Sequence, residues 1–492
     1  MSTLTSLARA YAVDRDCAQP ITTVRHVHIS DRPMVCVPLT LAGEANAPLA
    51  VMVGVDRDAP RLWVVPQPRD RNLRIEFAQH FAMALLHYCA TYVGSTGGKA
   101  GSCADDAPQL WVPNRAGIGF LNLLGRSTRF RSTTGPHAVG VAVPRLGTWL
   151  TFFAEQAEHP GSSLLMAATD ALGQHWATGQ SGLEDGNLAA LLGWIEPHSG
   201  SGGAQSALEA EDPLLWPPAG PTTDPMFDRE VLAPSIVEYD RASSDHERRR
   251  AITRIETAVR SQLVPTWQLM WRAVDQLRCV RPGAHVAQRW AKDIDAFQKF
   301  NTHVAAGGRP QPKRDSAVAA AHRLNWLERL QAEYDAQRAF DDPLVMAEFR
   351  LTGEAFAGVV TAVASDRRVG SGRQAVLRPV ITVLTQDPVR LVPGDGPLTD
   401  STRPRQQATV VSIDEVPHGL EVTLELAGGM GRSRIAPVGS IPAVNERVCF
   451  STLSDSYQPR GSFPTRDSTP WTHGGPPTEP TPTSNDANED WS

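Results

Sequence analysis

The sequence predicts an α+β protein of several domains: an N-terminal mixed α/β domain, a central helical bundle or stalk, a small C-terminal β-barrel and a disordered tail. Three observations predict this order. Apolar residues recur every three or four positions through the helical block Ser244–Phe340. Short runs rich in Val, Ile and Leu, separated by turn residues, lie before and after that block. A chain of 492 residues has room for about three domains.

The composition is typical of a globular protein, with 41% apolar and 20% charged residues. The formal net charge of -6 gives no general nucleic-acid signature. Arginine far outnumbers lysine, which indicates a compositional bias and makes arginine abundance weak evidence for phosphate binding. No apolar run approaches the roughly 20 residues that a membrane helix needs, and the first residues lack an apolar signal-peptide core. We therefore expect a cytoplasmic protein without a membrane contact.

Residues 1–195 form the expected α/β domain. A meander of four strands followed by a long helix is predicted, since short β-branched runs alternate with turns and then give way to helical spacing. The expected strands are Thr22–Ile29, Met34–Leu41, Leu49–Val55, Leu62–Val65, Leu110–Val112 and Val139–Val143. The expected helices are Arg74–Tyr92 and segments near Phe120–Leu124, Thr148–Ala157, Ser163–Leu172 and Asn187–Ile195.

Residues 196–237 change character and are expected to form a linker. A flexible Gly/Ser run at 199–203 precedes the stiff, extended sequence Trp216-Pro-Pro-Ala-Gly-Pro221. We expect this segment to cross a neighbouring surface, anchored by Leu214, Leu215 and Trp216.

Residues 238–345 contain the helical block, in which periodicity predicts four helices. Pro265 is expected to open the second helix, because a first helical turn tolerates proline. Pro282-Gly283 and the Gly/Pro loop at 305–312 separate the others. The block holds 17 Lys/Arg and 10 Asp/Glu, an excess of seven basic residues in a chain that is acidic as a whole.

Residues 346–455 are expected to form a small, OB-like β-barrel of five strands. The segment Leu420–Leu426 alternates apolar and polar residues, as a half-buried strand does. The other expected strands are Phe356–Ala364, Ala375–Leu384, Ala408–Ile413 and Arg447–Ser451. Residues 456–492 are rich in Pro, Thr, Ser and Gly and end acidic, so we expect a disordered tail. Its isolated Trp471 and Trp491, together with Trp216 in the linker, are candidate contacts for a protein partner.

The motifs of common catalytic and metal sites are incomplete in this sequence. Gly94–Ala100 resembles a phosphate loop, but its spacing is one residue short and Ala100 lacks the magnesium-binding hydroxyl. His26-Val27-His28 places two imidazoles on one side of a strand, without a third ligand at a persuasive spacing. The six cysteines show no C-x-x-C spacing, and no G-x-S-x-G elbow is present. We therefore predict no catalytic residues, no metal, no cofactor and no bound nucleotide.

Three arginine clusters are candidate phosphate contacts. The first follows Gly117-Ile118-Gly119, a lone G-x-G whose third fingerprint glycine is replaced by Asn122. Guanidinium groups and neighbouring hydroxyls can hold a phosphate backbone. The candidates are Arg126, Arg129 and Arg131, Arg248, Arg249 and Arg250 at the start of the helical block, and Arg432 and Arg434 in the barrel region.

These observations favour a non-catalytic adaptor or scaffold subunit of a cytoplasmic complex, which could act beside a nucleic-acid-processing enzyme. A protein partner is expected. One alternative is a nucleic-acid-binding subunit that contacts phosphates through the arginine clusters. The other is an enzyme with an unrecognised site in residues 1–195, for which a deep pocket lined by His26, His28 or Arg126 would be required.

Overall fold

The computed structural model describes residues 3–44, 47–93, 106–197, 200–370, 375–400, 402–403, 405–431 and 436–455. The described residues divide into two compact units, one over residues 5–327 and the other mainly over residues 328–455. Helix α12 (Ala317–Asp341) includes the boundary between them. None of the helices in the described ranges combines the length and apolar composition needed to cross a bilayer.

The first unit is built on a five-stranded sheet of order β4-β3-β2-β5-β6. β2 pairs antiparallel with β3, and β3 with β4, whereas β2 with β5 and β5 with β6 are parallel. β2 and β3 are buried at almost every position, as strands covered on both faces are. The strands are β2 (Met34–Thr40), β3 (Pro48–Gly54), β4 (Arg61–Val64), β5 (Leu110–Val112) and β6 (Leu165–Ala167).

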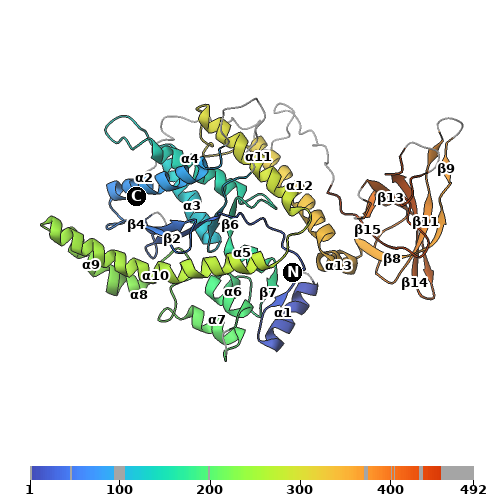
Figure 1. Cartoon of the computed structure of the whole chain (residues 1–492), viewed down its shortest axis with the longest axis horizontal. Helices are drawn as coiled ribbons and strands as arrows, with labels where there is room; N and C mark the ends of the chain where they lie inside the picture. The colour runs from blue at the N-terminus through green and yellow to red at the C-terminus, as the bar shows by residue number, and fades with distance from the viewer. Residues whose placement is uncertain are drawn as a thin grey trace, which may run out of the picture. The chain divides into compact units, whose positions relative to one another are not determined.

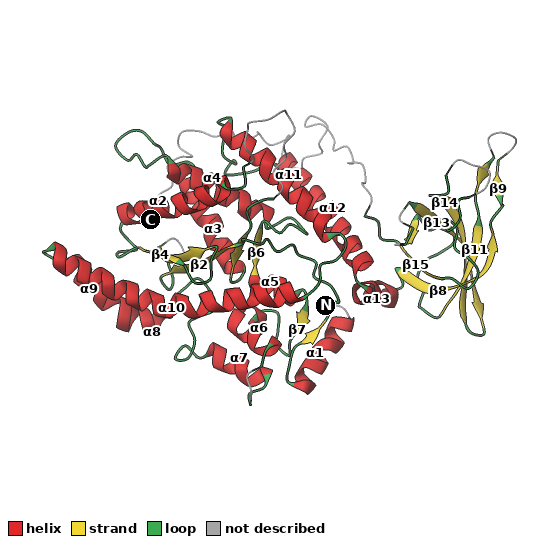
Figure 2. Cartoon of the chain, viewed as in Figure 1, coloured by secondary structure: helices red, strands yellow, loops and turns green. Residues whose placement is uncertain are grey.

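Two hydrophobic clusters cover the two faces of this sheet (Figures 1 and 2). One cluster contains Phe81, Leu121, Phe153 and Phe297 and brings together α2 (Arg71–Ala90), α3 (Arg115–Thr128), α4 (Ala142–Gln156) and α11 (Val286–Ala305). The other is made by α5 (Ala168–Gly173), α6 (Leu188–Ile195) and the long helix α10 (Asp245–Cys279). The first two helices of the expected helical block, α10 and α11, thus pack on the sheet together with the helices of residues 1–195.

Smaller elements surround this core. α1 (Thr3–Arg15), α6 and α7 (Gly203–Glu211) share a cluster around Trp194. β1 (Gln19–Pro20) pairs with β7 (Trp176–Ala177). The remaining elements are the short turn η1 (Glu184–Gly186), α8 (Pro225–Phe227), the π-helical turn η2 (Asp228–Leu232) and α9 (Ala233–Arg241), which runs alongside α10 (Figure 1).

Several sequence expectations for this unit are wrong. Residues 22–29 form no strand, and Val139–Val143 is not a strand because α4 begins at Ala142. Ser163–Leu172 is not one helix but β6 followed by α5. The block Ser244–Phe340 contains three helices, since α10 continues through Pro265. The apolar stripe on both sides of that proline packs against the sheet, and this packing outweighs the lost hydrogen bond.

The second unit contains a closed antiparallel barrel of order β11-β14-β13-β12-β15-β8. Val422, Leu424 and Leu426 are buried in it, as their alternation predicts, together with Phe356 and Phe450. Six strands close the barrel rather than the five expected, because the short β12 was not predicted. The elements are α13 (Pro343–Thr352), β8 (Ala355–Ala364), β9 (Arg368–Val369), β10 (Val376–Leu377), β11 (Val380–Thr385), β12 (Leu398–Asp400), β13 (Gln406–Val416), β14 (Gly419–Gly428) and β15 (Arg447–Ser451).

Candidate functional site

The carboxyl ends of the parallel strands β2, β5 and β6 lie at one edge of the sheet. From β2 the chain continues to β3 on one side, and from β5 it continues through α3 and α4 to β6 on the other. Open α/β sheets bind ligands outside such carboxyl ends, at the point where the strand order reverses. The crevice between the ends of β2 and β5 is therefore the first place to look for a site.

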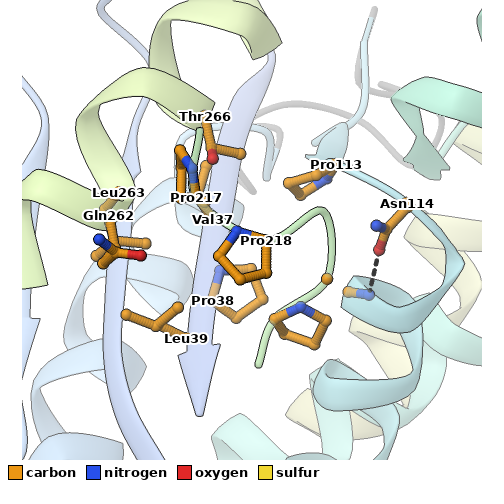
Figure 3. A pocket seen from close by; sticks show the side chains of 13 residues that line it. Val37, Pro38, Leu39, Pro113, Asn114, Pro217, Pro218, Gln262, Leu263 and Thr266 are labelled. Atoms are coloured by element: carbon orange, nitrogen blue, oxygen red, sulfur yellow. Dashed lines mark hydrogen bonds between the residues drawn. The ribbon is translucent and has the colours of Figure 1, made fainter. Parts of the chain in front are cut away.

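The chain itself fills this crevice. Residues 216–221, which we call the strap, lie across the ends of β2 and β5, and Figure 3 shows Pro218 between Pro38 and Leu39 of β2 and the Pro113-Asn114 turn. The Thr40 N–H donates to the Pro221 carbonyl (2.5 Å), and the Thr223 N–H donates back to the Thr40 carbonyl (3.0 Å). About 10 Å³ remains free, which is at the lower limit for one water molecule.

Asn114 holds the strap in place. Its side-chain oxygen caps α3 by accepting from the Gly117 N–H (3.2 Å), as the dashed line in Figure 3 marks. Its amide group donates to the carbonyls of Ala219 (2.5 Å) and Gly186 (3.2 Å). Gly117 serves close packing, because a Cβ there would lie 2.9 Å from Cβ of Val112. The G-x-G sequence thus has a structural role at its first glycine.

Beyond the strap, an open cleft of about 800 Å³ lies at the ends of β5 and β6. This volume is within the range of small-ligand sites. Its walls come from α1, the start of α3, α5, the loop around η1 and the end of α7. The polar and charged lining residues are Arg9, Asn114, Arg115, Thr169, Asp170, Gln174, Glu184, Asp185, Asn187 and Glu211. We call this the strand-end cleft.

Most charged groups of the strand-end cleft are paired within the protein. Asp185 accepts from the Thr178 hydroxyl (2.6 Å) and faces Arg9 (3.5 Å). Burial raises the pKa of Asp185, and these two neighbours oppose that rise. Arg115 Nε donates to Asp170 Oδ2 at 2.7 Å. These charge-assisted hydrogen bonds and ion pairs fix the positions of the side chains that line the cleft. A cleft whose lining is fixed in this way is suited to binding a ligand or a segment of another protein.

Two more polar side chains of the cleft are committed to local structure. Ser181 donates its N–H to Glu184 (2.7 Å), and the hydrogen bonds from Ser181 lower the pKa of this carboxyl. Asn187 caps α6 through its oxygen and donates its amide to the Ala210 carbonyl (3.2 Å). Glu211, at the end of α7, makes no ion pair within the described residues.

One strongly exposed leucine lines the strand-end cleft, and three others lie on or just after α7, whose last residue forms part of its wall. Leu183 lines it and is 91% exposed, and Leu208, one helical turn before Glu211 on α7, is 67% exposed. Leu214 and Leu215 follow α7 directly and are 86% and 62% exposed. We call these four residues the leucine rim. Of the three expected anchors of the linker, only Trp216 packs against the core, and the two leucines do not.

The first predicted arginine cluster does not converge on one site. Arg126 is exposed. Arg129 is 4% exposed and donates to the carbonyls of Gln311 (3.0 Å) and Pro312 (3.2 Å), so its guanidinium holds the loop before α12. Arg131 Nε donates to the Ser127 carbonyl (3.0 Å). A phosphate role for Arg129 is therefore not supported by its surroundings.

Of the other predicted phosphate and partner contacts, the structure describes only some. Arg248, Arg249 and Arg250 are exposed on the first turns of α10, with Arg248 over the Tyr239 ring. Arg432, Arg434, Trp471, Trp491 and the Gly94–Ala100 loop lie outside the described residues. Several other barrel arginines are paired with carboxylates, including Arg367 with Glu425 (2.6 Å) and Arg403 with Asp400 (3.0 Å).

The two histidines of the expected strand lie in a filled interior at the opposite edge of the sheet. His26 is 1% exposed and donates its N–H to His175 Nε2 (3.1 Å). His28 stacks on Trp290 with 4.1 Å between ring centroids, and burial lowers its pKa to about 4. Asp293 accepts from the Ser163 N–H (2.7 Å), and burial raises its pKa to about 7. No cluster of three His, Cys, Asp or Glu among the described residues is placed to hold a metal.

Of these features, the sequence singled out only Leu214 and Leu215 of the leucine rim, as anchors of the linker, and did not point to Asn114 or the strand-end cleft. A local signal existed for Asn114 alone, because an asparagine after a strand and before a helix is a typical N-cap. The chain matches no protein-family model, no curated protein and no solved structure.

Proposed function

We propose that the protein is an adaptor or scaffold that binds a partner protein through the leucine rim and the strand-end cleft. The observation that carries the proposal is the exposure of four leucines, 62–91% each, of which Leu183 lines the cleft and the other three lie on or just after α7, which ends at its wall. Isolated exposed leucines are ordinary, but several on neighbouring segments are typical of an interaction site. A polar cleft beside apolar residues also has the composition of a protein interface, in which the polar groups orient one particular segment of a partner.

The charge of the cleft indicates the kind of segment. Among the described residues that line the cleft are four carboxylates, those of Asp170, Glu184, Asp185 and Glu211, and two guanidiniums, those of Arg9 and Arg115. Arg9 and Arg115 are engaged with Asp185 and Asp170, and Glu184 accepts a hydrogen bond from the neutral Ser181. Glu184 and Glu211 therefore make no ion pair within the described residues. The partner segment that complements this surface carries aliphatic side chains and a lysine or arginine.

The proposal is tested by comparing proteins captured from lysate of the source cells on the wild type and on the triple variant L183S/L214S/L215S. We expect one partner, captured in stoichiometric amount, to be lost from the triple variant. The partner is then purified and its Kd measured by calorimetry, where the triple variant is expected to bind at least about tenfold more weakly.

Leu324→Ser is the matched control, because Leu324 is 60% exposed on α12 and belongs to neither the rim nor the cleft. The three substituted leucines are all exposed, so the triple variant should keep the melting temperature of the wild type. Equal capture by the wild type and the triple variant would remove the basis for this function.

A further inference from the structure

A second groove, separate from the leucine rim, lies beside α9. It encloses about 400 Å³. One wall is the turn after β2, with Leu41 and Ala42, and another is the segment before α2, with Gln67. Its floor and third wall are η2 and α9. Gln67 Nε2 donates to Asp240 Oδ2 (2.8 Å), which ties α9 to the second wall.

One stripe of α9 lines this groove. Ala233, Ile236, Val237 and Asp240 have the spacing i, i+3, i+4 and i+7, so they share one side of the helix. Val237 remains 42% exposed. A helix that packs one side on its own core normally presents polar residues elsewhere. The stripe is therefore a partly uncovered apolar surface with the periodicity that a second helix can pack against.

The charges around the groove favour a basic occupant. Arg69 is paired with Glu44 (3.0 Å) and Arg229 with Glu230 (3.0 Å). Asp228 and Asp240 make no ion pair within the described residues. Asp228 Oδ2 accepts from the Ala42 N–H (2.9 Å), whereas its Oδ1 is buried and accepts no hydrogen bond from those residues. The carboxylates of Asp228 and Asp240 therefore leave negative charge at the groove that a lysine or arginine of an occupant would complement.

We propose that this groove binds an amphipathic helix of a partner protein, with aliphatic side chains packed on Val237 and Ile236 and a lysine or arginine directed at Asp228. Helix-in-groove binding uses this combination of an apolar stripe and a fixed polar contact. The site goes beyond the leucine rim and does not depend on it. With both surfaces, one chain can hold two partners at the same time.

The test uses the full chain and a fluorescein-labelled synthetic peptide with leucines at positions i, i+3, i+4 and i+7 and one lysine on the same side. Titration is followed by anisotropy, and amide hydrogen exchange maps the footprint. We expect saturable binding, with protection at 41–44 and 228–240. Val237→Glu should weaken binding at least about tenfold, because it places a charge in the apolar contact.

Asp228→Asn tests the polar contact, since asparagine still accepts from Ala42 but carries no charge. It should weaken the lysine peptide about fivefold or more and leave a peptide with norleucine at that position unaffected. Val141→Glu, at the exposed N-cap position before α4, is the control for added charge. Failure of the wild type to bind the lysine peptide, or undiminished binding by Val237→Glu, overturns the proposal. Binding retained by L183S/L214S/L215S separates it from the leucine rim.

Discussion

Arg129 is a structural residue, although its sequence context suggested a phosphate contact. Arg129→Ala removes the donors to the Gln311 and Pro312 carbonyls and should lower the free energy of unfolding by about 2 kcal/mol. Arg126→Ala, at an exposed position, should stay within about 0.5 kcal/mol of the wild type. Urea unfolding followed by tryptophan fluorescence measures both, and equal effects would contradict the structural role.

Asp293 makes the free energy of unfolding fall as the pH rises. Its pKa is about 7 in the folded protein against 3.8 for a free side chain, so between these values the folded state holds a proton that the unfolded chain releases. Raising the pH then favours unfolding. Relative to wild type, Asp293→Asn should therefore gain stability as pH rises from about 4 to 7, by up to about 1.4 kcal/mol per pH unit. Parallel stability curves for the two proteins would refute this.

His28 acts in the opposite direction over nearly the same range. Burial lowers its pKa from 6.5 to about 4, so the folded state lacks a proton that the unfolded chain binds, and stability rises with pH across that interval. His28→Phe keeps a ring against Trp290 and removes the titration. We expect a flatter stability curve between about pH 4 and 6.5 for this variant. An unchanged slope in urea unfolding would show that His28 titrates normally.

The strap occupies the crevice between the ends of β2 and β5, so its stability controls whether that crevice is accessible. Asn114→Ala removes both the α3 cap and the hydrogen bonds to Ala219 and Gly186, so we expect a loss of about 2 kcal/mol in unfolding free energy. Faster amide exchange at residues 216–223 would show that the strap has loosened. Asn122→Ala, inside the same helix, should leave that exchange unchanged. Equal exchange in Asn114→Ala and the wild type would mean that the prolines and Thr40 hold the strap without Asn114.

The elements that the sequence predicts well have a clear periodicity and clear ends. β2, β3 and β15 are found within one or two residues of their expected bounds, because β-branched runs end at turn residues. The sequence predicts a helix over Ser163–Leu172, where Leu, Met and Ala favour one. Burial between β5 and the helices makes its first half a strand. Here tertiary packing overrides local propensity.

The candidate surfaces were not predictable in the same way. Arg9, Asn114, Asp185 and Glu211 meet in the strand-end cleft although they are far apart in the sequence. No local pattern connects them, since the cleft exists only after the sheet orders its strands. Of the expected linker 196–237, residues 216–221 do cross the sheet edge and Trp216 packs against the core, because prolines and an aromatic residue are local features. The rest of that range is largely helical, in α7, α8, η2 and α9, and Leu214 and Leu215 are exposed.

At the scale of the molecule, each compact unit has its own hydrophobic core. Phe450→Ala in the barrel and Phe153→Ala in the first unit each remove a fully buried ring and should cost about 3–5 kcal/mol. We expect two transitions in calorimetry, with each variant lowering the temperature of a different one. A shift of both transitions by either variant would show that the two units unfold together.

The contact of α3 with α4 depends on two glycines. A Cβ at Gly147 would lie 2.2 Å from the Arg129 nitrogen, and one at Gly125 would lie 3.0 Å from the Thr151 nitrogen, so the two backbones touch at the carboxyl end of α3. The amino end of this 14-residue helix, about 20 Å away, carries Asn114. An added methyl group at position 147 would collide with the Arg129 backbone. We expect it to tilt the whole of α3 and so to displace Asn114 at its other end. A substitution at this buried position, far from the strap, would then change how tightly Asn114 holds the strap over the ends of β2 and β5.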